Sequence, residues 1–388
     1  MNNILVITPI YKIIGRKDIE TDTQCVHDLI KYWGDYNKIK VVIPHIRGMK
    51  QLHNFFNKEL LQYYKNGYNY NLDNIDILMV ESQNIYFGQF KRFKKDIKRM
   101  CGIIERNFAF SKFEPSFITV HIPSVCQEII EQLNYSTRKK IAVLHYSDVK
   151  YAKKQKQNFI TYLENNYDSV YCRSNAIYNY FKTLNLKNLE SEIVYSGVPK
   201  VNTKFEINKS AETKRKKILY VGKLIKRKNL DLLIKALSKI DKNCWELNII
   251  GKGKMFDKYQ KIVNKNGLEQ QVKFLGTLPK EDVLKYMKKS DIFCMPSVGE
   301  TLGLVYIEAM SQGCITIGTK NEGIDGIIKN EINGYLTNPN EEDIYKLLYK
   351  IINSKSIDNI SMSKNAIKTA KFYNEEDMSK IYYKLLTK

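Results

Sequence analysis

Short apolar runs alternate with amphipathic stretches along nearly the whole chain, and this alternation constrains the fold more than any other feature. The strand-like runs fall at 4–9, 40–43, 75–80, 117–121, 140–145, 169–172, 218–222, 246–250, 272–275, 292–295 and 314–318. Helical spacing is clearest at 229–240, 280–288 and 302–312. Strands that alternate with helices are typical of parallel sheets covered by helices on both faces. We therefore expect an α/β protein built from doubly wound sheets.

The length of 388 residues exceeds what one ordinary core organises, so about two domains are expected. Polar and charged residues with little periodicity fill 201–214, which is typical of a linker. Ligands bind doubly wound sheets at the carboxyl ends of the strands, so we expect two domains that face a central cleft. The predicted segments are a domain at 1–200, a linker at 201–217, a domain at 218–370 and a helix at 371–388 that packs back on the first domain.

The net charge of +22 favours an anionic partner, such as phosphates, nucleic acid or acidic lipid headgroups. No nucleic-acid-binding motif is present, so we expect no nucleic acid partner. Seven dispersed cysteines without C-x-x-C spacing indicate a reducing compartment and argue against a zinc site. With no signal peptide and no apolar stretch of about 20 residues, we expect a cytoplasmic protein whose membrane contact, if any, is peripheral.

Two glutamates with seven residues between them suggest the chemistry. Glu300 follows an apolar run and a Ser-Val-Gly turn, and 302–312 is predicted to be a helix that Gly313 closes. Glu308 then lies about 10 Å along that helix, at 1.5 Å per residue. This is about the span from a sugar ring, across a diphosphate, to a ribose, and the amides at the helix start can hold the phosphates. The spacing favours a nucleotide-sugar site.

An ordered set of motifs between 218 and 339 resembles the nucleotide-binding half of GT-B fold, family 4 retaining glycosyltransferases. The pieces are Tyr220-Val221-Gly222-Lys223-Leu224, Lys228-Asn229-Leu230-Asp231, Leu247-Asn248-Ile249-Ile250-Gly251-Lys252-Gly253, Val272-Lys273-Phe274-Leu275-Gly276, the two glutamates and Asn333-Gly334-Tyr335-Leu336. The resemblance implies two Rossmann-like domains, an N-terminal one for the acceptor and a C-terminal one for the donor. It also implies retaining transfer of a hexose or N-acetylhexosamine from a nucleoside diphosphate sugar, most commonly a UDP-sugar, with no further cofactor. The expected acceptor is a glycan or lipid-linked saccharide of cell-surface polysaccharide synthesis.

The resemblance also implies roles for individual residues. Glu300 would contact hydroxyls of the donor sugar beside the reacting carbon, and Glu308 would accept hydrogen bonds from the ribose. Backbone amides at the helix start would hold the diphosphate, and those expected are Gly303, Leu304 and Val305. The plain alternative for an isolated pair of glutamates is two solvated surface acids.

Two lysines stand where the family grips the diphosphate. Lys228 matches the family's lysine, whereas Lys223 replaces the usual arginine and so lacks its planar fork. The neighbouring Arg227 is an alternative for that contact. Fixed cations stabilise a departing phosphate without a metal, and the chain has no Asp-x-Asp pair, so we expect no metal site. The resemblance further places Gly251, Phe274 and Leu275 along the nucleotide.

The N-terminal half resembles the family more faintly. Of the glycine-rich loop expected after the first strand, only Gly15 remains, and we assign Gly15 and His121 to the acceptor side. His145 resembles the family's histidine near the reacting sugar, where it would bind a sugar hydroxyl or steady charge. Glu300 and His145 would then position the donor sugar, while Lys228 stabilises the departing diphosphate. The alternative for both histidines is a role in packing.

The basic segment 89–100 places Phe90, Phe93, Ile97 and Met100 on one helical face, with lysines and arginines over the rest. Such a helix is suited to an anionic membrane surface, or it is an ordinary surface helix with its apolar face in the core. A second functional reading is a non-catalytic GT-B subunit that binds a glycan or a partner glycosyltransferase. Epimerisation of a sugar nucleotide is a third.

Overall fold

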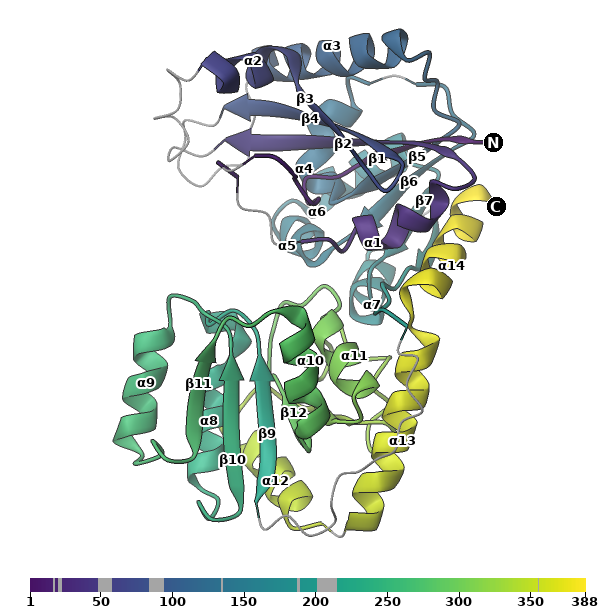
Figure 1. Ribbon diagram of the computed structural model, residues 1–388. Coiled ribbons are helices and arrows are strands. Elements are labelled where there is room, and N and C mark those ends of the chain that lie inside the picture. The colour runs from purple at the N-terminus through teal and green to yellow at the C-terminus, as the bar shows by residue number, and fades with distance from the viewer. Residues whose placement is uncertain are drawn as a thin grey trace. The chain divides into compact units, whose positions relative to one another are not determined.

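The computed structural model describes residues 1–388 apart from 17, 20–22, 48–57, 84–93, 134, 187–188, 201–214 and 355. The chain forms two compact units (Figure 1). The first, called the N-terminal unit, comprises 1–173, 177–196 and 376–388, and the second, called the C-terminal unit, comprises 174–176 and 197–375. Most of the predicted linker lies outside the described residues, and its last two positions already belong to a strand.

The N-terminal unit contains an eight-stranded sheet in the order β3-β4-β2-β1-β5-β6-β7-β8. All neighbouring strands are parallel except β3, which is antiparallel to β4. The strands are β1 (Asn3–Ile7), β2 (Lys38–Arg47), β3 (Tyr68–Leu72), β4 (Ile75–Gln83), β5 (Phe117–His121), β6 (Lys139–Leu144), β7 (Ser169–Cys172) and β8 (Glu190–Ile193). The predicted alternation of strands and helices is confirmed here.

Both faces of this sheet are buried, which explains the continuous apolar runs of its strands. Along β1, Leu5 and Ile7 enter one core cluster while Ile4 and Val6 enter the other. The first cluster is covered by helices that include α3 (Lys94–Phe110), α4 (Pro123–Ile130), α5 (Tyr146–Lys154), α6 (Lys156–Asn166) and α7 (Asn175–Lys182). The second is covered by α1 (His27–Ile30), the 3₁₀ turn η1 (Lys31–Trp33) and α14 (Glu375–Thr387), while α2 (Lys58–Asn66) packs against β4.

Helix α14 is an integral part of the N-terminal unit. The indole nitrogen of Trp33 donates to the carbonyl of Ser379 at 3.0 Å, and the hydroxyl of Ser379 donates to the carbonyl of Leu29 at 2.6 Å. The ring of Tyr382 is fully buried and lies 4.9 Å from that of Trp33. These contacts close the face of the sheet that α1 and η1 leave open.

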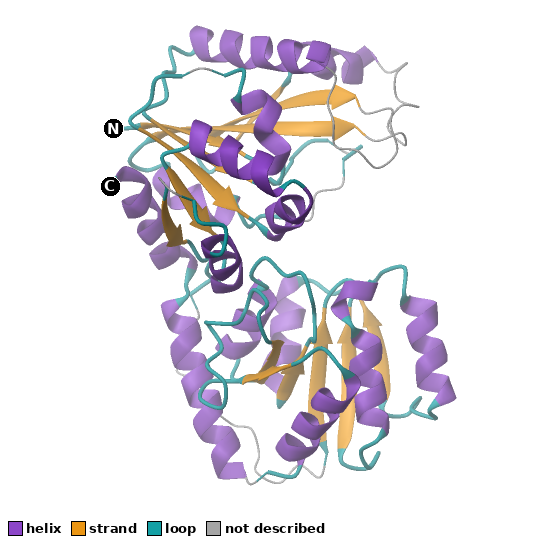
Figure 2. Cartoon of the chain, turned by 180° about the vertical axis from the view of Figure 1, so that it is seen from behind, coloured by secondary structure: helices purple, strands orange, loops and turns teal. Residues whose placement is uncertain are grey.

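The C-terminal unit contains a six-stranded, wholly parallel sheet in the order β11-β10-β9-β12-β13-β14. The strands are β9 (Lys216–Val221), β10 (Trp245–Ile250), β11 (Val272–Gly276), β12 (Ile292–Cys294), β13 (Ile315–Thr319) and β14 (Tyr335–Thr337). Helices α8 (Leu230–Ser238), α9 (Phe256–Lys265) and α12 (Glu341–Ile352) pack together on one face. Helices α10 (Lys280–Lys289), α11 (Leu304–Ser311) and α13 (Ser356–Phe372) pack together on the other (Figure 2).

The sequence pattern did not reveal three strands, which all lie at sheet edges: β3, β8 and β14. In β3 and β8 half-buried residues alternate with exposed ones, so neither strand carries the apolar run that marks a central strand. The predicted helix at 302–312 begins two residues late, because Gly303 has a left-handed backbone (φ 85°) that cannot continue a helix. Gly313 closes it as predicted, with φ 72°.

The described part of the basic segment 89–100 belongs to α3. Ile97 and Met100 are buried in the N-terminal core, whereas Phe90 and Phe93 lie outside the described residues.

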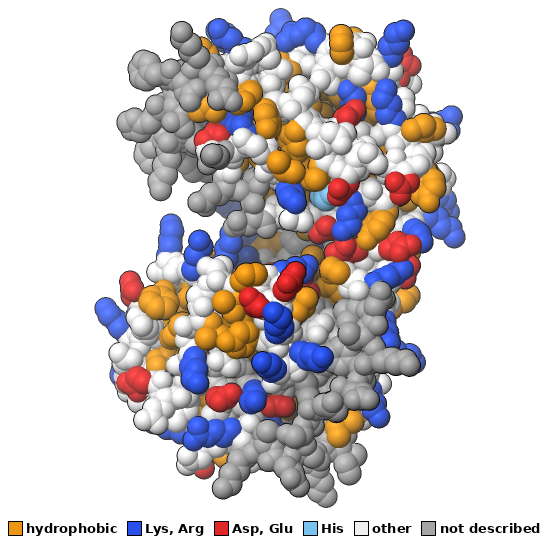
Figure 3. Space-filling model, viewed as in Figure 1, with side chains coloured by type: hydrophobic (Ala, Val, Ile, Leu, Met, Phe, Trp, Pro, Cys, Tyr) orange, Lys and Arg blue, Asp and Glu red, His pale blue; other side chains and the backbone are white. Residues whose placement is uncertain are grey.

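Figure 3 shows Lys and Arg side chains spread over the face that it presents, with Asp and Glu between them. Among the helices in the described ranges, none combines the length and apolar character that a membrane crossing requires.

Candidate active site

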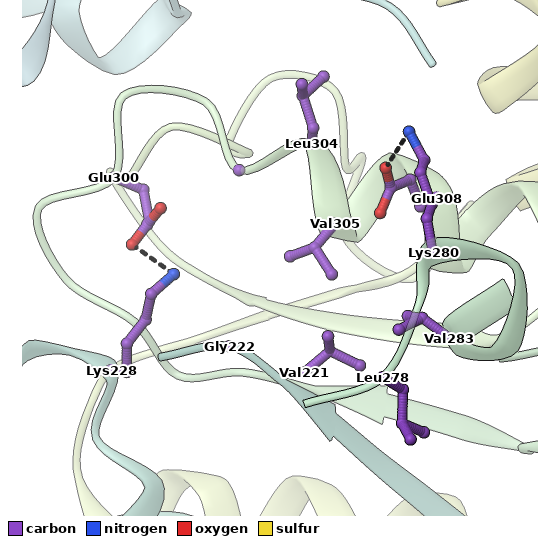
Figure 4. A pocket seen from close by; sticks show the side chains of 11 residues that line it. Val221, Gly222, Lys228, Leu278, Lys280, Val283, Glu300, Leu304, Val305 and Glu308 are labelled. Carbon is purple, nitrogen blue, oxygen red and sulfur yellow. Dashed lines mark ion pairs between the residues drawn. The ribbon is translucent and has the colours of Figure 1, made fainter. Parts of the chain in front are cut away.

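One hollow of about 440 Å³ in the C-terminal unit collects most of the predicted donor-binding residues (Figure 4). The lining comes from the end of β9, the turn after it, the loop from β11 into α10, the loop after β12 and the first turns of α11. The lining residues are Val221, Gly222, Lys228, Leu278, Lys280, Val283, Glu300, Gly303, Leu304, Val305 and Glu308. Parallel strands end at one edge of the sheet, and this places loops far apart in sequence around one hollow.

Glu300 is held in place through one of its carboxylate oxygens. The hydroxyl of Ser297 donates to Oε1 at 2.6 Å, and the ammonium of Lys228 lies 2.9 Å from the same atom. The guanidinium of Arg227 also donates to Oε1. In the described part of the chain no side chain is bonded to Oε2. A hydroxyl group in the hollow would therefore meet an oriented carboxylate with one oxygen still available.

The surroundings of Glu300 favour its charged form. Burial raises the pKa of the Glu300 carboxyl, but Lys228, Ser297 and Arg227 outweigh burial and the net pKa lies below the ordinary value. Burial lowers the pKa of the Lys228 ammonium, and the charge of Glu300 opposes that effect. The contact with Glu300 therefore stabilises the charged ammonium of Lys228 in its buried position beside the hollow.

Helix α11 begins at the wall of the hollow. Gly303 precedes it, and a β-carbon at this position would come within 2.6 Å of the Tyr306 ring. The space and the left-handed backbone therefore both require glycine here. The amides of Leu304 and Val305 lie in the first helical turn, where the helix itself supplies no acceptor. Such amides bind anions readily.

Glu308 faces the hollow from α11, and it has a partner that the sequence did not reveal. The ammonium of Lys280, at the start of α10, lies 3.3 Å from Oε1 of Glu308. Figure 4 shows this pair and the pair of Lys228 with Glu300 on either side of Leu304 and Val305. The pairing of Lys280 with Glu308 depends on the packing of α10 against α11, and no local sequence motif indicates that packing.

Four predicted donor-binding residues do not line the hollow. Lys223 is exposed in the turn after β9. Gly251 packs against the backbone of Gly222, where a β-carbon would collide with the carbonyl oxygen, so its contribution is close packing. Phe274 is half-buried against the ring of Phe256 at 5.2 Å, and Leu275 is half-buried next to it.

His145 and His121 lie together in the N-terminal unit, at the carboxyl ends of β6 and β5. Nδ1 of His121 is 3.1 Å from Nε2 of His145, and the hydroxyl of Tyr382 is 3.3 Å from Nε2 of His121. Burial lowers the pKa of both imidazoles well below the ordinary value, and the charge of Arg173 adds to the effect. A neutral imidazole still donates and accepts hydrogen bonds through its two nitrogens, so both roles predicted for His145 stay predictions.

Gly15 lies in a segment that side chains of β3 fix in place. The hydroxyl of Tyr68 donates to the carbonyl of Ile14 at 2.8 Å, and that of Tyr70 donates to the carbonyl of Lys12. With φ 81° and the Tyr68 hydroxyl directly against it, position 15 strongly favours glycine. The segment is thus ordered without the glycine-rich sequence that the family resemblance led us to expect.

Known structures share this fold over their whole length. Sucrose-phosphate synthase of Thermosynechococcus elongatus superposes with a TM-score of 0.71 at 16% identity, over 100% of both chains. HepE of Anabaena, in a complex with UDP and glucose, gives a TM-score of 0.69 at 16% identity, also over 100% of both chains. The chain therefore has the GT-B glycosyltransferase fold, as predicted.

The family match covers part of the chain. Residues 202–371, which contain the hollow, match the family described as Glycosyl transferases group 1. An uncharacterised glycosyltransferase of Methanocaldococcus jannaschii is 30% identical over 220 residues, or 56% of this chain and 59% of that protein. The GPI3 subunit of phosphatidylinositol N-acetylglucosaminyltransferase from Saccharomyces cerevisiae is 28% identical over 179 residues, or 43% of this chain and 39% of the subunit. The amylovoran biosynthesis glycosyltransferase AmsK of Erwinia amylovora is 30% identical over 128 residues, 31% of each chain. The narrower assignment to family 4 stays a prediction.

Proposed function

We propose that this chain is a retaining, metal-independent glycosyltransferase. It moves a hexose or N-acetylhexosamine from a UDP-sugar to a glycan or lipid-linked saccharide. The observation that carries the proposal is one hollow in which two carboxylates, each beside a lysine, lie on either side of the first turn of α11 (Figure 4). Carboxylates accept hydrogen bonds from sugar and ribose hydroxyls, and helix amides donate to phosphates.

Three similarities support the choice of donor and acceptor. HepE, whose fold is similar, has been solved with UDP and glucose bound. The yeast relative is named as a subunit of an N-acetylglucosaminyltransferase acting on phosphatidylinositol, and AmsK is named for amylovoran biosynthesis. These proteins favour a UDP-sugar and an acceptor that is a glycan or is attached to a lipid.

In the proposed reaction the bond between the anomeric carbon and the diphosphate breaks, and a bond to the acceptor oxygen forms on the same face. The departing phosphate oxygen takes the proton of the acceptor hydroxyl. Lys228 and the amides of Leu304 and Val305 stabilise the negative charge that develops on the diphosphate. Glu300 orients the sugar through Oε2, while Ser297, Lys228 and Arg227 hold Oε1.

The remaining parts of the proposal concern the N-terminal unit. His145 is proposed to position the donor sugar together with Glu300, and Gly15 and His121 are proposed to lie on the acceptor side. The proposed place of action is the cytoplasm, with the basic segment 89–100 as a peripheral contact for an anionic membrane. Because Ile97 and Met100 are buried in the core, the contact is proposed for the exposed Lys94, Lys95 and Lys98 and not for the apolar face. The net charge of +22 supports that contact electrostatically.

The test is a thermal-shift series with UDP, GDP and ADP, followed by UDP-glucose, UDP-galactose and UDP-N-acetylglucosamine. Saturating UDP, at about 100 times its dissociation constant, is expected to add about 2.7 kcal/mol to the free energy of unfolding. Absence of any shift with all three diphosphates would contradict the proposal. Release of UDP from the best sugar nucleotide then separates an enzyme from a binding subunit, which would bind without turnover.

Replacing Glu308 by glutamine is expected to weaken UDP binding on the order of 10-fold, because a charge-assisted hydrogen bond to the ribose becomes a neutral one. Discrimination between UDP and 2′-deoxy-UDP should shrink in the same variant, and titration calorimetry with both ligands measures this. Glu342→Gln is the matched control, since Glu342 is exposed on α12 and its partners, Lys346 and Lys239, are exposed lysines. Unchanged discrimination in Glu308→Gln would rule out the ribose contact.

A further inference from the structure

We propose that Glu322 is a positioning residue that fixes the backbone of the loop carrying Glu300. This inference rests on the proposed function, in which Glu300 contacts the donor sugar. Glu322 does not line the hollow, and its effect on catalysis passes through Glu300. No sequence motif pointed to it, because it lies 22 residues beyond Glu300 in the loop that follows β13.

The carboxylate of Glu322 accepts two backbone hydrogen bonds. Oε2 receives the amide of Gly299 at 2.8 Å and the amide of Glu300 at 3.0 Å. The backbones of the two loops also touch, because a β-carbon on Gly323 would lie 2.6 Å from Cα of Leu302. The loop before α11 is therefore held at two places, by hydrogen bonds at Gly299 and Glu300 and by backbone packing at Leu302.

A half-buried carboxylate at position 322 lowers the stability of the folded chain unless hydrogen bonds or opposite charges compensate for its burial. Burial raises the pKa of the Glu322 carboxyl, the neighbouring charge of Glu300 raises it further, and the charge of Arg227 acts in the opposite direction. The two amides offset part of this cost. A neutral side chain would avoid the repulsion between two carboxylates, so the position is better explained by what Glu322 holds than by packing.

Two consequences follow for the proposed site. The amides of Gly299 and Glu300 donate to Glu322 and are therefore not free to bind the diphosphate, which agrees with the proposed role of the amides of Leu304 and Val305. Glu300 is also fixed at both ends, with its amide on Glu322 and its Oε1 on Ser297 and Lys228. Such fixation keeps Oε2 at one place relative to the sugar, which is the kind of orientation that governs turnover more than binding.

Two variants separate the hydrogen bonds from the charge. Glu322→Gln retains a carbonyl oxygen that can accept both amides, whereas Glu322→Ala removes the acceptor. We expect kcat for release of UDP from the donor sugar to fall about 10- to 100-fold in Glu322→Ala, with KM within about threefold of the original chain. Glu322→Gln should keep kcat within about threefold, and Glu342→Ala on the exposed face of α12 serves as the control for loss of an acid.

A second measurement does not depend on activity. Hydrogen exchange at the amides of Gly299 and Glu300 should accelerate in Glu322→Ala and stay near the original rate in Glu322→Gln. Equal exchange in all three chains overturns the positioning role, and so does a Glu322→Gln variant as impaired in kcat as Glu322→Ala. A chain that releases no UDP from any sugar nucleotide overturns the proposed function instead, and the exchange result still decides the role of Glu322.

Discussion

Glu300→Gln is expected to lower transfer from the donor sugar by about 10²–10³-fold while UDP still binds, because the lost interaction is made with the sugar at the reacting centre. The glutamine keeps the shape of the side chain but removes the charge that Lys228 and Arg227 hold. Steady-state release of UDP and calorimetric binding of UDP measure the two effects separately. Glu342→Gln, which alters an exposed acid of α12, should change neither.

The lowered pKa of the Glu300 carboxyl allows a prediction of how activity and stability depend on pH. The pKa of Glu300 is lowered in the folded chain, so its charged form persists to a pH below the ordinary carboxyl range of about 4.3. The stability that the pair contributes is fully present above the unfolded pKa and is lost as the pH falls through the folded pKa. The measurement is the pH dependence of activity in the original chain and in Glu300→Gln. A loss of activity near pH 6 that is absent in Glu300→Gln would contradict a lowered pKa of Glu300.

Lys228→Met is the second change with a large expected effect. Turnover should fall about 100-fold, because the cation beside the departing diphosphate is removed. The variant should also lose about 1–3 kcal/mol of folding free energy, since a largely buried carboxylate loses a partner. Arg227 remains bonded to Glu300 and limits that loss. Kinetics and thermal unfolding measure the two losses, and Lys346→Met on the exposed face of α12 should change neither appreciably.

The double variant Lys228→Met with Glu300→Gln tests whether the two residues act as a pair. Each single change leaves one buried group without its counterpart, whereas the double change removes both. The combined loss of folding free energy should therefore be smaller than the sum of the single losses. Strict additivity would mean that the 2.9 Å contact does not couple them in solution.

The central strands were predictable because they are buried on both faces. The bounds of β5 and β7 coincide with the apolar runs at 117–121 and 169–172. Edge strands such as β8 were not predictable, because their residues alternate between half-buried and exposed, and such a sequence resembles that of a loop. The start of α11 was misplaced because helical spacing cannot reveal that Gly303 adopts a left-handed backbone.

The candidate site was predictable where each residue belongs to a recognisable local motif. Glu300, Glu308 and Lys228 reach the same hollow, although their roles stay predictions. Lys280 and Glu322 come from neighbouring loops, and only the order of the strands brings them to the glutamates. Partners created by strand order carry no signal in a single sequence, so sequence reasoning missed both.

The way α14 completes the N-terminal core has a consequence for biosynthesis. The ribosome makes residues 1–196 long before it makes 376–388, yet Tyr382 and Ser379 cover Trp33 in the finished unit. Until that helix emerges, the nascent first unit exposes apolar surface and is vulnerable to aggregation. A truncated chain that stops before residue 376 should therefore require chaperones that the whole chain no longer needs.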